Sequence, residues 1–108
     1  MNKIHLLDCT LRDGGYVNNW EFDNGVAKEI VNGLYKSGIH VIEIGIMGHG
    51  GKVGKSTKFA SFKEAESLLE NRKKDCKYAI MLNQAEAASF DIPARSEKTV
   101  DMIRLAYF

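Results

Sequence analysis

Four short apolar runs, separated by amphipathic stretches, constrain the fold of this chain more than any other feature. The runs span residues 4–10, 40–46, 78–83 and 102–108 and are rich in Ile, Val, Leu and Tyr. Each run is too short for a helix and has the composition of a buried strand. We therefore predict four strands at these positions, in which residues 42, 44 and 46 share one face.

The stretches between the runs have helical periodicity. Apolar residues recur every three or four positions across residues 26–34, Asp23 or Asn24 can cap the start, and Gly38 predicts the end. Ser61 followed by Glu64 forms a capping box that opens a second helix. Residues 85–89 fit either a helix or a loop, and Pro93 predicts the start of a short helical turn.

Strands that alternate with helices predict the α/β class, with a parallel sheet built from βαβ units. The spacing of the strands is compatible with an eight-unit (β/α)8 TIM barrel, which takes about 250 residues. We expect residues 1–108 to be the amino-terminal half of such a domain, with no internal boundary. The last apolar run, at residues 102–108, lacks the helix that should follow and cover it, so we expect the chain to be a fragment of such a domain.

Composition narrows the class of protein further. The 108 residues carry 15 basic and 14 acidic side chains, a balance that argues against a nucleic-acid partner. We find neither a secretory signal nor an apolar stretch long enough to span a membrane. Cys9 and Cys76 are expected to be free thiols, and the protein is expected to be cytoplasmic.

Polar residues interrupt three of the predicted strands. Alternation places Glu43 opposite the helix-facing isoleucines, puts Asn83 opposite Ile80 and Leu82, and separates Arg104 from its apolar neighbours. A buried carboxylate requires a cationic or donor partner, and Arg12, after the first strand, can supply it. Each residue taken alone is consistent with a structural hydrogen-bond network, whereas together they indicate a site.

Residues 8–15, with the sequence DCTLRDGG, resemble the first-strand signature of the DRE-TIM metallolyases. The IEIG segment at residues 42–45 is similar to the second-strand segment that carries the glutamate of that superfamily. The superfamily contains (β/α)8 barrels that include isopropylmalate synthase, hydroxymethylglutaryl-CoA lyase and 4-hydroxy-2-oxovalerate aldolase. The resemblance is strongest to aldolase-like members in which an asparagine and tryptophan stretch follows, here residues 17–20.

The resemblance implies a metal-dependent aldolase or lyase that acts on a 2-keto acid or acyl substrate. It implies that Asp13 binds Mg²⁺ or Mn²⁺, that Arg12 stabilises an enolate, and that Glu43 holds Arg12. Such roles suit a hard oxygen ligand and a planar guanidinium. We also predict that Asn83, Arg104 and Tyr16 contact the substrate, loop packing being the alternative for Tyr16.

Two departures from the superfamily pattern limit this prediction. The three histidines, His5, His40 and His49, contain no His-x-His pair, so the metal site is incomplete, and Tyr16 stands where related enzymes have histidine or glutamine. We therefore expect the chain alone to be inactive. We also expect it to self-associate through unpaired edge strands.

The glycine-rich segment at residues 48–57 leaves an alternative open. It suggests a small α/β binding module for a phosphate-bearing ligand, although the glycines are out of register for a Walker A loop and a mobile active-site loop is favoured. A non-catalytic structural fragment is a third possibility. Arg72, Lys73 and Lys74 are expected to be solvated charges near a helix end.

Overall fold

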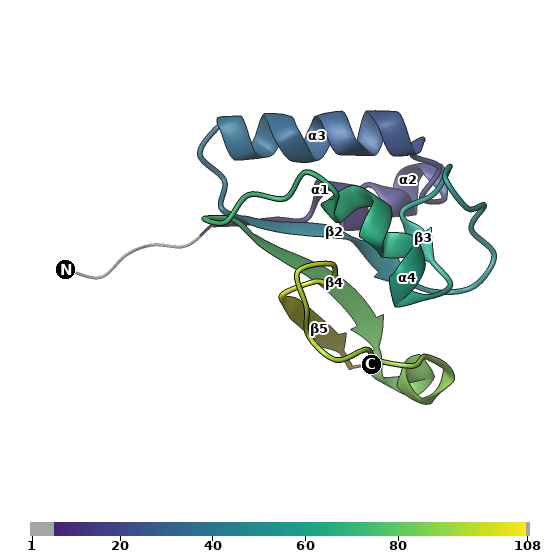
Figure 1. Cartoon of the computed structure of the whole chain (residues 1–108). Coiled ribbons are helices and arrows are strands. Elements are labelled where there is room, and N and C mark those ends of the chain that lie inside the picture. The colour runs from purple at the N-terminus through teal and green to yellow at the C-terminus, as the bar shows by residue number, and fades with distance from the viewer. Residues whose placement is uncertain (1–5, 108) are drawn as a thin grey trace.

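A computed structural model of the chain describes residues 6–107. Its sheet contains the strands β1 (Leu7–Asp8), β2 (Val41–Met47), β4 (Lys77–Asn83) and β5 (Met102–Ala106), side by side in chain order (Figure 1). A further strand, β3 (Lys58–Phe59), pairs with the end of β2. All of these pairings are parallel, so the predicted α/β class with a parallel sheet is confirmed.

The strands match the sequence predictions unequally. β2 and β4 begin and end within one residue of the expected bounds, and β5 ends at Ala106. The first strand was predicted too long, because the Asp8 carboxylate accepts a hydrogen bond from the Thr10 amide where helix α1 (Thr10–Asp13) begins. β3 was not predicted at all. Residues 4, 5 and 108 of the predicted strands lie outside the described part.

The predicted helices are present with their caps. Asp23 accepts a hydrogen bond from the Gly25 amide at the start of α3 (Asn24–Lys36), and Gly38, with φ 93°, follows its end. Ser61 caps α4 (Phe62–Ala65) by accepting from the Glu64 amide, and the chain continues as the 3-10 helix η1 (Glu66–Leu69). The remaining helices are α2 (Gly15–Asn18) and the 3-10 helix η2 (Gln84–Ser89).

Two local predictions were wrong. Residues around Pro93 form no helical turn. In β2, Glu43 and Ile46 are three positions apart while their partners in β4, Ala79 and Met81, are two positions apart, so a bulge lies between Glu43 and Ile46. A side chain at Gly45 would lie 2.1 Å from the Thr57 carbonyl oxygen, so only glycine fits there. The bulge removes Ile46 from the core face and places Met47 there instead.

The apolar core lies between the sheet and one layer of helices. Side chains of β2 and β4 that share a face pack with residues of α3, α4 and η1, namely Ile42, Ile44, Ile80, Leu82, Ala27, Val31, Phe62, Ala65, Leu68 and Leu69. The crossover helices therefore cover the same face, and α3 runs along it in Figure 1. The opposite face of the strands carries the polar residues.

No helix within residues 6–107 combines the length and the apolar character needed to cross a membrane. The longest of them, α3, has 13 residues.

Candidate functional site

Glu43 is the centre of a cluster of three charged side chains. Its side chain is 0% exposed, and its Oε1 accepts a hydrogen bond from Arg12 Nε at 2.6 Å. Its Oε2 accepts a second bond from Arg104 Nη1 at 2.8 Å. We call Arg12, Glu43 and Arg104 the arginine clamp. The predicted pairing of Arg12 with Glu43 is present, and Arg104 joins it from β5.

The elements explain how the clamp forms. Glu43 lies on β2 and Arg104 on β5, and both point away from the helix-covered face because their strand neighbours face the core. β4 lies between these strands, where Glu43 is paired with the small Ala79 and Arg104 is paired with Met81, two residues further along β4. Arg12 reaches Glu43 from α1, directly after β1.

The clamp carries more positive than negative charge. Two guanidinium groups, 15% and 36% exposed, face one carboxylate. Burial lowers the pKa of Arg12, but the hydrogen bond and the charge of Glu43 outweigh burial and raise it overall. Each guanidinium has five N–H donors, of which Glu43 takes one from each. Arg12 Nη1 also donates to Asp13 Oδ1 at 3.3 Å, and the remaining donors of the two guanidinium groups suit a small anion.

Asp13 lies beside the clamp and is open to solvent. Its side chain is 68% exposed, and Arg12 Nη1 lies 3.3 Å from its Oδ1. Carboxylate oxygen suits Mg²⁺ or Mn²⁺, but such ions take about six ligands. Within residues 6–107 there is no group of three His, Cys, Asp or Glu side chains that could hold a metal. The described residues therefore do not form a metal site by themselves.

Tyr16 and Asn83 are predicted site residues that form no hydrogen bond or ion pair with the clamp within residues 6–107. Tyr16 is 60% exposed in α2, and its ring packs edge-on against Trp20 at 4.8 Å between centroids. Asn83 ends β4 on the same face as Met81, and its Oδ1 is buried without a hydrogen-bond partner in the described part of the chain. A buried acceptor without a donor is rare, so Asn83 is able to receive one from a ligand.

The turn that carries Arg12 is fixed by two residues that sequence reasoning did not connect with the site. The Trp20 indole Nε1 donates to the Arg12 carbonyl at 2.8 Å, and the Thr57 hydroxyl donates to the Leu11 carbonyl at 2.8 Å. Trp20 belongs to the stretch 17–20 that the family resemblance had singled out. Thr57 gave no such signal, because only the fold brings it to α1.

The backbone at Asn19 and Trp20 is strained. Their φ angles are 57° and 55°, in the left-handed region. For an L-residue this region costs about 1–2 kcal/mol. The Trp20 ring covers Gly15 so closely that a Cβ there would lie 1.8 Å from the indole. Contacts of the surrounding structure therefore hold the indole in place over the turn.

Backbone hydrogen bonds connect the glycine-rich segment at residues 48–57 to the rest of the fold. The Asn24 amide donates to the Gly54 carbonyl, and the Thr57 amide donates to the Trp20 carbonyl. The segment leads into β3, and no helix opens at Lys55, as expected from the Walker A mismatch. A hollow of about 430 Å³ beside it is lined by Lys52 and Lys55 but also by Glu21 and Asp23. This mixture of charges does not favour a phosphate group.

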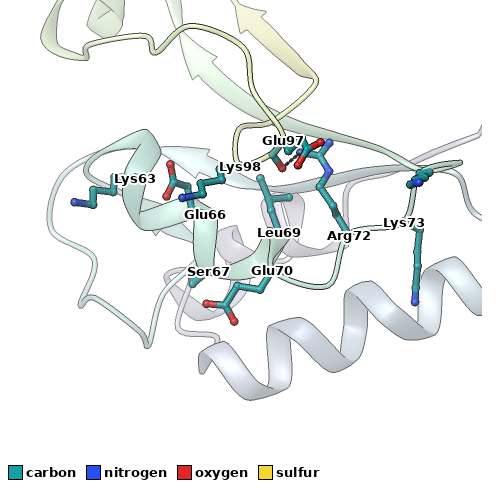
Figure 2. Close-up of a pocket in the computed structure, with 10 residues that line it drawn as sticks. Lys63, Glu66, Ser67, Leu69, Glu70, Arg72, Lys73, Glu97 and Lys98 are labelled. Carbon is teal, nitrogen blue, oxygen red and sulfur yellow. Dashed lines mark hydrogen bonds between the residues drawn. The ribbon is translucent and has the colours of Figure 1, made fainter.

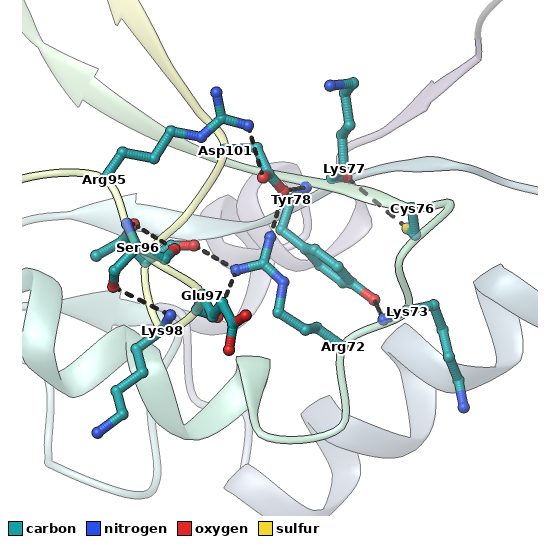
Figure 3. Close-up of polar contacts among 11 residues, drawn as sticks. Arg72, Lys73, Cys76, Lys77, Tyr78, Arg95, Ser96, Glu97, Lys98 and Asp101 are labelled. Carbon is teal, nitrogen blue, oxygen red and sulfur yellow. Dashed lines mark hydrogen bonds and ion pairs between the residues drawn. The ribbon is translucent and has the colours of Figure 1, made fainter.

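A second arginine and carboxylate cluster lies where β4 and β5 begin (Figure 3). Arg72 Nη2 lies 2.5 Å from Asp101 Oδ2, which also accepts from the Tyr78 amide at 2.9 Å. Arg72 Nη1 donates to the Thr99 and Glu97 carbonyls. We call Arg72, Tyr78, Arg95 and Asp101 the Asp101 cluster. The prediction that Arg72 is a solvated charge was wrong, because it links two loops.

A hollow of about 790 Å³ lies outside the clamp, along η1 and the loops that follow it (Figure 2). Its lining mixes the basic side chains Lys63, Arg72, Lys73, Lys74 and Lys98 with the acidic Glu66, Glu70 and Glu97. Long charged side chains on a surface make such hollows without a ligand, so we do not assign the site to it.

Comparison with known proteins gives one informative similarity. The chain is 24% identical over 110 aligned positions to 4-hydroxy-2-oxovalerate aldolase 6 of Rhodococcus jostii (strain RHA1). The alignment includes 97% of this chain but 30% of that protein, so the chain spans less than a third of its length. No family model and no solved structure matches the chain. The similarity agrees with the superfamily that residues 8–15 resemble.

Proposed function

We propose that the chain supplies the first strands and the enolate-stabilising groups of a divalent-metal-dependent aldolase or lyase barrel. The similarity to an aldolase supports this proposal. So does the order of the parallel strands, whose crossovers cover one face as in a (β/α)8 barrel. The observation that carries it is the arginine clamp, in which a fully buried Glu43 holds Arg12 at 2.6 Å.

The chemistry assigned to the clamp is stabilisation of negative charge. When the bond between carbons 3 and 4 of a 4-hydroxy-2-keto acid breaks, the proton of the 4-hydroxyl leaves to a base and carbon 4 becomes a carbonyl. The electrons of the broken bond move to the keto oxygen as an enolate. The enolate carbon then takes a proton, and the reverse sequence forms the bond. Arg12, held by Glu43, offers N–H donors to the enolate oxygen without having to reorganise.

The other predicted residues complete the proposal. Asp13 would contribute one oxygen ligand to Mg²⁺ or Mn²⁺, which stabilises negative charge on a substrate oxygen when bound. Arg104 would bind the carboxylate of the keto acid. Asn83 lies two residues, or about 6.6 Å, further along β4 than Met81, the residue that pairs with Arg104. Its side chain would accept a hydrogen bond from the substrate. Tyr16 would contact the substrate from α2.

Binding of oxalate tests the proposal without requiring turnover. Oxalate is a planar dianion that resembles the enolate of pyruvate, and Trp20, the single tryptophan, reports on its arrival by fluorescence. We expect oxalate to bind more tightly than sulfate, a dianion of different shape, and we expect Arg12→Lys to remove the difference. Equal binding of both anions to the wild-type chain would contradict the proposal.

The metal part of the proposal has its own test. Mn²⁺ added to the chain with oxalate is expected to tighten oxalate binding, and Asp13→Ala is expected to remove this effect. Asp13→Asn serves as a control of similar shape that keeps one oxygen. An Mn²⁺ effect of the same size in Asp13→Ala would place the metal elsewhere.

We also propose that copies of the chain associate through the outer strands. Exposed apolar side chains gather on β1 and β5 and the residues next to them, namely Leu6, Leu7, Met102, Leu105 and Tyr107. Within the described residues each of these strands is paired on one side. Light scattering is expected to show a mass above that of a 12.1 kDa monomer. A monomer at high concentration would refute the association.

A further inference from the structure

We propose that Trp20 is a positioning residue, whose indole N–H sets the turn of α1 so that Arg12 meets Glu43. The inference rests on the proposed function in one respect, namely that Arg12 is the group that must be aimed. It adds a role for the stretch 17–20, to which neither the aldolase similarity nor the motif at residues 8–15 assigns one.

The first observation is a pair of hydrogen bonds at the end of a very short helix. α1 has four residues, so the carbonyls of Leu11 and Arg12 have few partners within the helix. Side chains satisfy both of them, Thr57 at Leu11 and Trp20 at Arg12, each at 2.8 Å. The backbone of Arg12 is therefore held from outside its own helix.

The second observation is that the indole itself is locked. The Trp20 amide donates to the Gly15 carbonyl at 3.0 Å, and its carbonyl accepts from the Thr57 amide at 2.9 Å. The ring lies over Gly15, where no side chain fits, and Lys58 Nζ lies 5.0 Å from the ring centroid. A bulky residue in the left-handed region persists only when its surroundings determine it.

Together these contacts connect Thr57, the residue before β3, to the clamp. Thr57, which is 0% exposed, fixes the Trp20 backbone and the Leu11 carbonyl, and the indole fixes the Arg12 carbonyl. Arg12 Nε then points at Glu43 Oε1. A rotation of the turn would move the guanidinium away from a carboxylate that forms no other hydrogen bond with α1 among the described residues.

The test measures by NMR, without ligand, how fast the hydrogen on Arg12 Nε exchanges with solvent. Its bond to Glu43 slows its exchange with solvent, and the Tyr78 amide, bonded to Asp101, reports on opening of the whole fold. Trp20→Phe keeps an aromatic ring and removes the N–H donor. We expect exchange at Arg12 Nε to become about five- to tenfold faster, the factor that corresponds to one lost hydrogen bond. Exchange at the Tyr78 amide should not change.

Three further variants keep the test decisive. Thr57→Val retains the shape and loses the hydroxyl, and it should accelerate the same signal, whereas Thr57→Ser should not. Lys58→Met removes the ammonium over the indole and should leave the exchange rate at Arg12 Nε unchanged. An unchanged Arg12 signal in both Trp20→Phe and Thr57→Val overturns the inference, as does equal acceleration at Arg12 and Tyr78.

Oxalate separates the inference from the proposed function. Positioning predicts that Trp20→Phe, read by the NMR signals of Arg12, weakens oxalate binding by about the same five- to tenfold factor. A wild-type chain that does not bind oxalate contradicts the proposed function alone, because the exchange of the Arg12 Nε hydrogen is measured without ligand. Oxalate binding that is equally tight in Trp20→Phe and wild type overturns the positioning role.

Discussion

The arginine clamp and the Asp101 cluster share one arrangement of charges but differ in their surroundings. In each, one carboxylate lies between two arginines, and both carboxylates are largely buried, with Glu43 0% and Asp101 14% exposed. In the Asp101 cluster the partners are mostly backbone groups, since Asp101 accepts from the Tyr78 amide and Arg72 donates to two carbonyls. In the clamp Glu43 bonds only to side chains within the described residues.

This difference separates a structural cluster from a functional one. Backbone bonds tie Arg72 and Asp101 to the loops before β4 and β5, so their donors and acceptors are used to hold the chain together. The guanidinium groups of the clamp keep N–H donors for another partner. Arg12 of the clamp follows the end of β1, and Glu43 and Arg104 lie within β2 and β5, whereas the Asp101 cluster lies where β4 and β5 begin.

The largest effect is expected from removing the central carboxylate of the clamp. Glu43→Ala leaves two partly buried guanidinium groups without their partner, which costs about 3 kcal/mol of the free energy of unfolding. Urea denaturation measures the loss. Glu43→Gln keeps the shape and is expected to lose less, and a loss in Glu43→Ala below that of Glu43→Gln would argue against a charge-based role.

The corresponding change in the other cluster is expected to cost less. Asp101→Asn keeps the size of the side chain but weakens its bonds to Arg72 and the Tyr78 amide, at a cost of about 2 kcal/mol. Urea denaturation again gives the value, and oxalate affinity should remain that of the wild type. If oxalate affinity fell as well, the two clusters would not be independent.

The Asp101 cluster should also respond to alkaline pH through Tyr78. Burial raises the pKa of Tyr78 to about 12, whereas a tyrosine in an unfolded chain titrates near about 10. Because the folded pKa is the higher one, its stabilising contribution is complete below pH 10 and is lost between pH 10 and 12. Between pH 9 and 11 the unfolding free energy should fall by about 1 kcal/mol more in wild type than in Tyr78→Phe. Equal slopes in urea titrations would contradict the burial of this hydroxyl.

The smallest effect is expected from the exposed arginine of the same cluster. Arg95 Nη2 lies 3.3 Å from Asp101 Oδ1, but its side chain is 70% exposed. Exposed pairs contribute little, so Arg95→Ala should change the unfolding free energy by less than about 0.5 kcal/mol. If Arg95→Ala lowered the midpoint of thermal unfolding as much as Asp101→Asn does, the cluster would depend on both arginines equally.

Sequence patterns predicted the elements whose formation depends on local order. Apolar periodicity gave β2, β4 and α3, and alternation placed Glu43 on the polar face, where Arg12 meets it. Alternation failed at Ile46, because a bulge changes the count and no local pattern announces it. β3 was missed since a strand of two residues exists only through its partner.

Contacts between distant residues could not be predicted in the same way. Arg104 was expected to bind substrate, but its bond to Glu43 depends on which strands are neighbours and on their register along β4. Arg72 and Asp101 are 29 positions apart, and only the packing of two loops joins them. Trp20 was noticed as a motif, but its role requires the left-handed turn that brings the indole back to Arg12.

A matched pair of arginine-to-lysine variants tests the central claim most directly. Oxalate affinity and the urea midpoint would be measured for Arg12→Lys and Arg72→Lys. We expect Arg12→Lys to weaken oxalate binding by about tenfold or more with a small change in midpoint, and Arg72→Lys to lower the midpoint with unchanged affinity. If both variants lost stability alike and neither changed oxalate affinity, the clamp would be a second structural cluster and not the site.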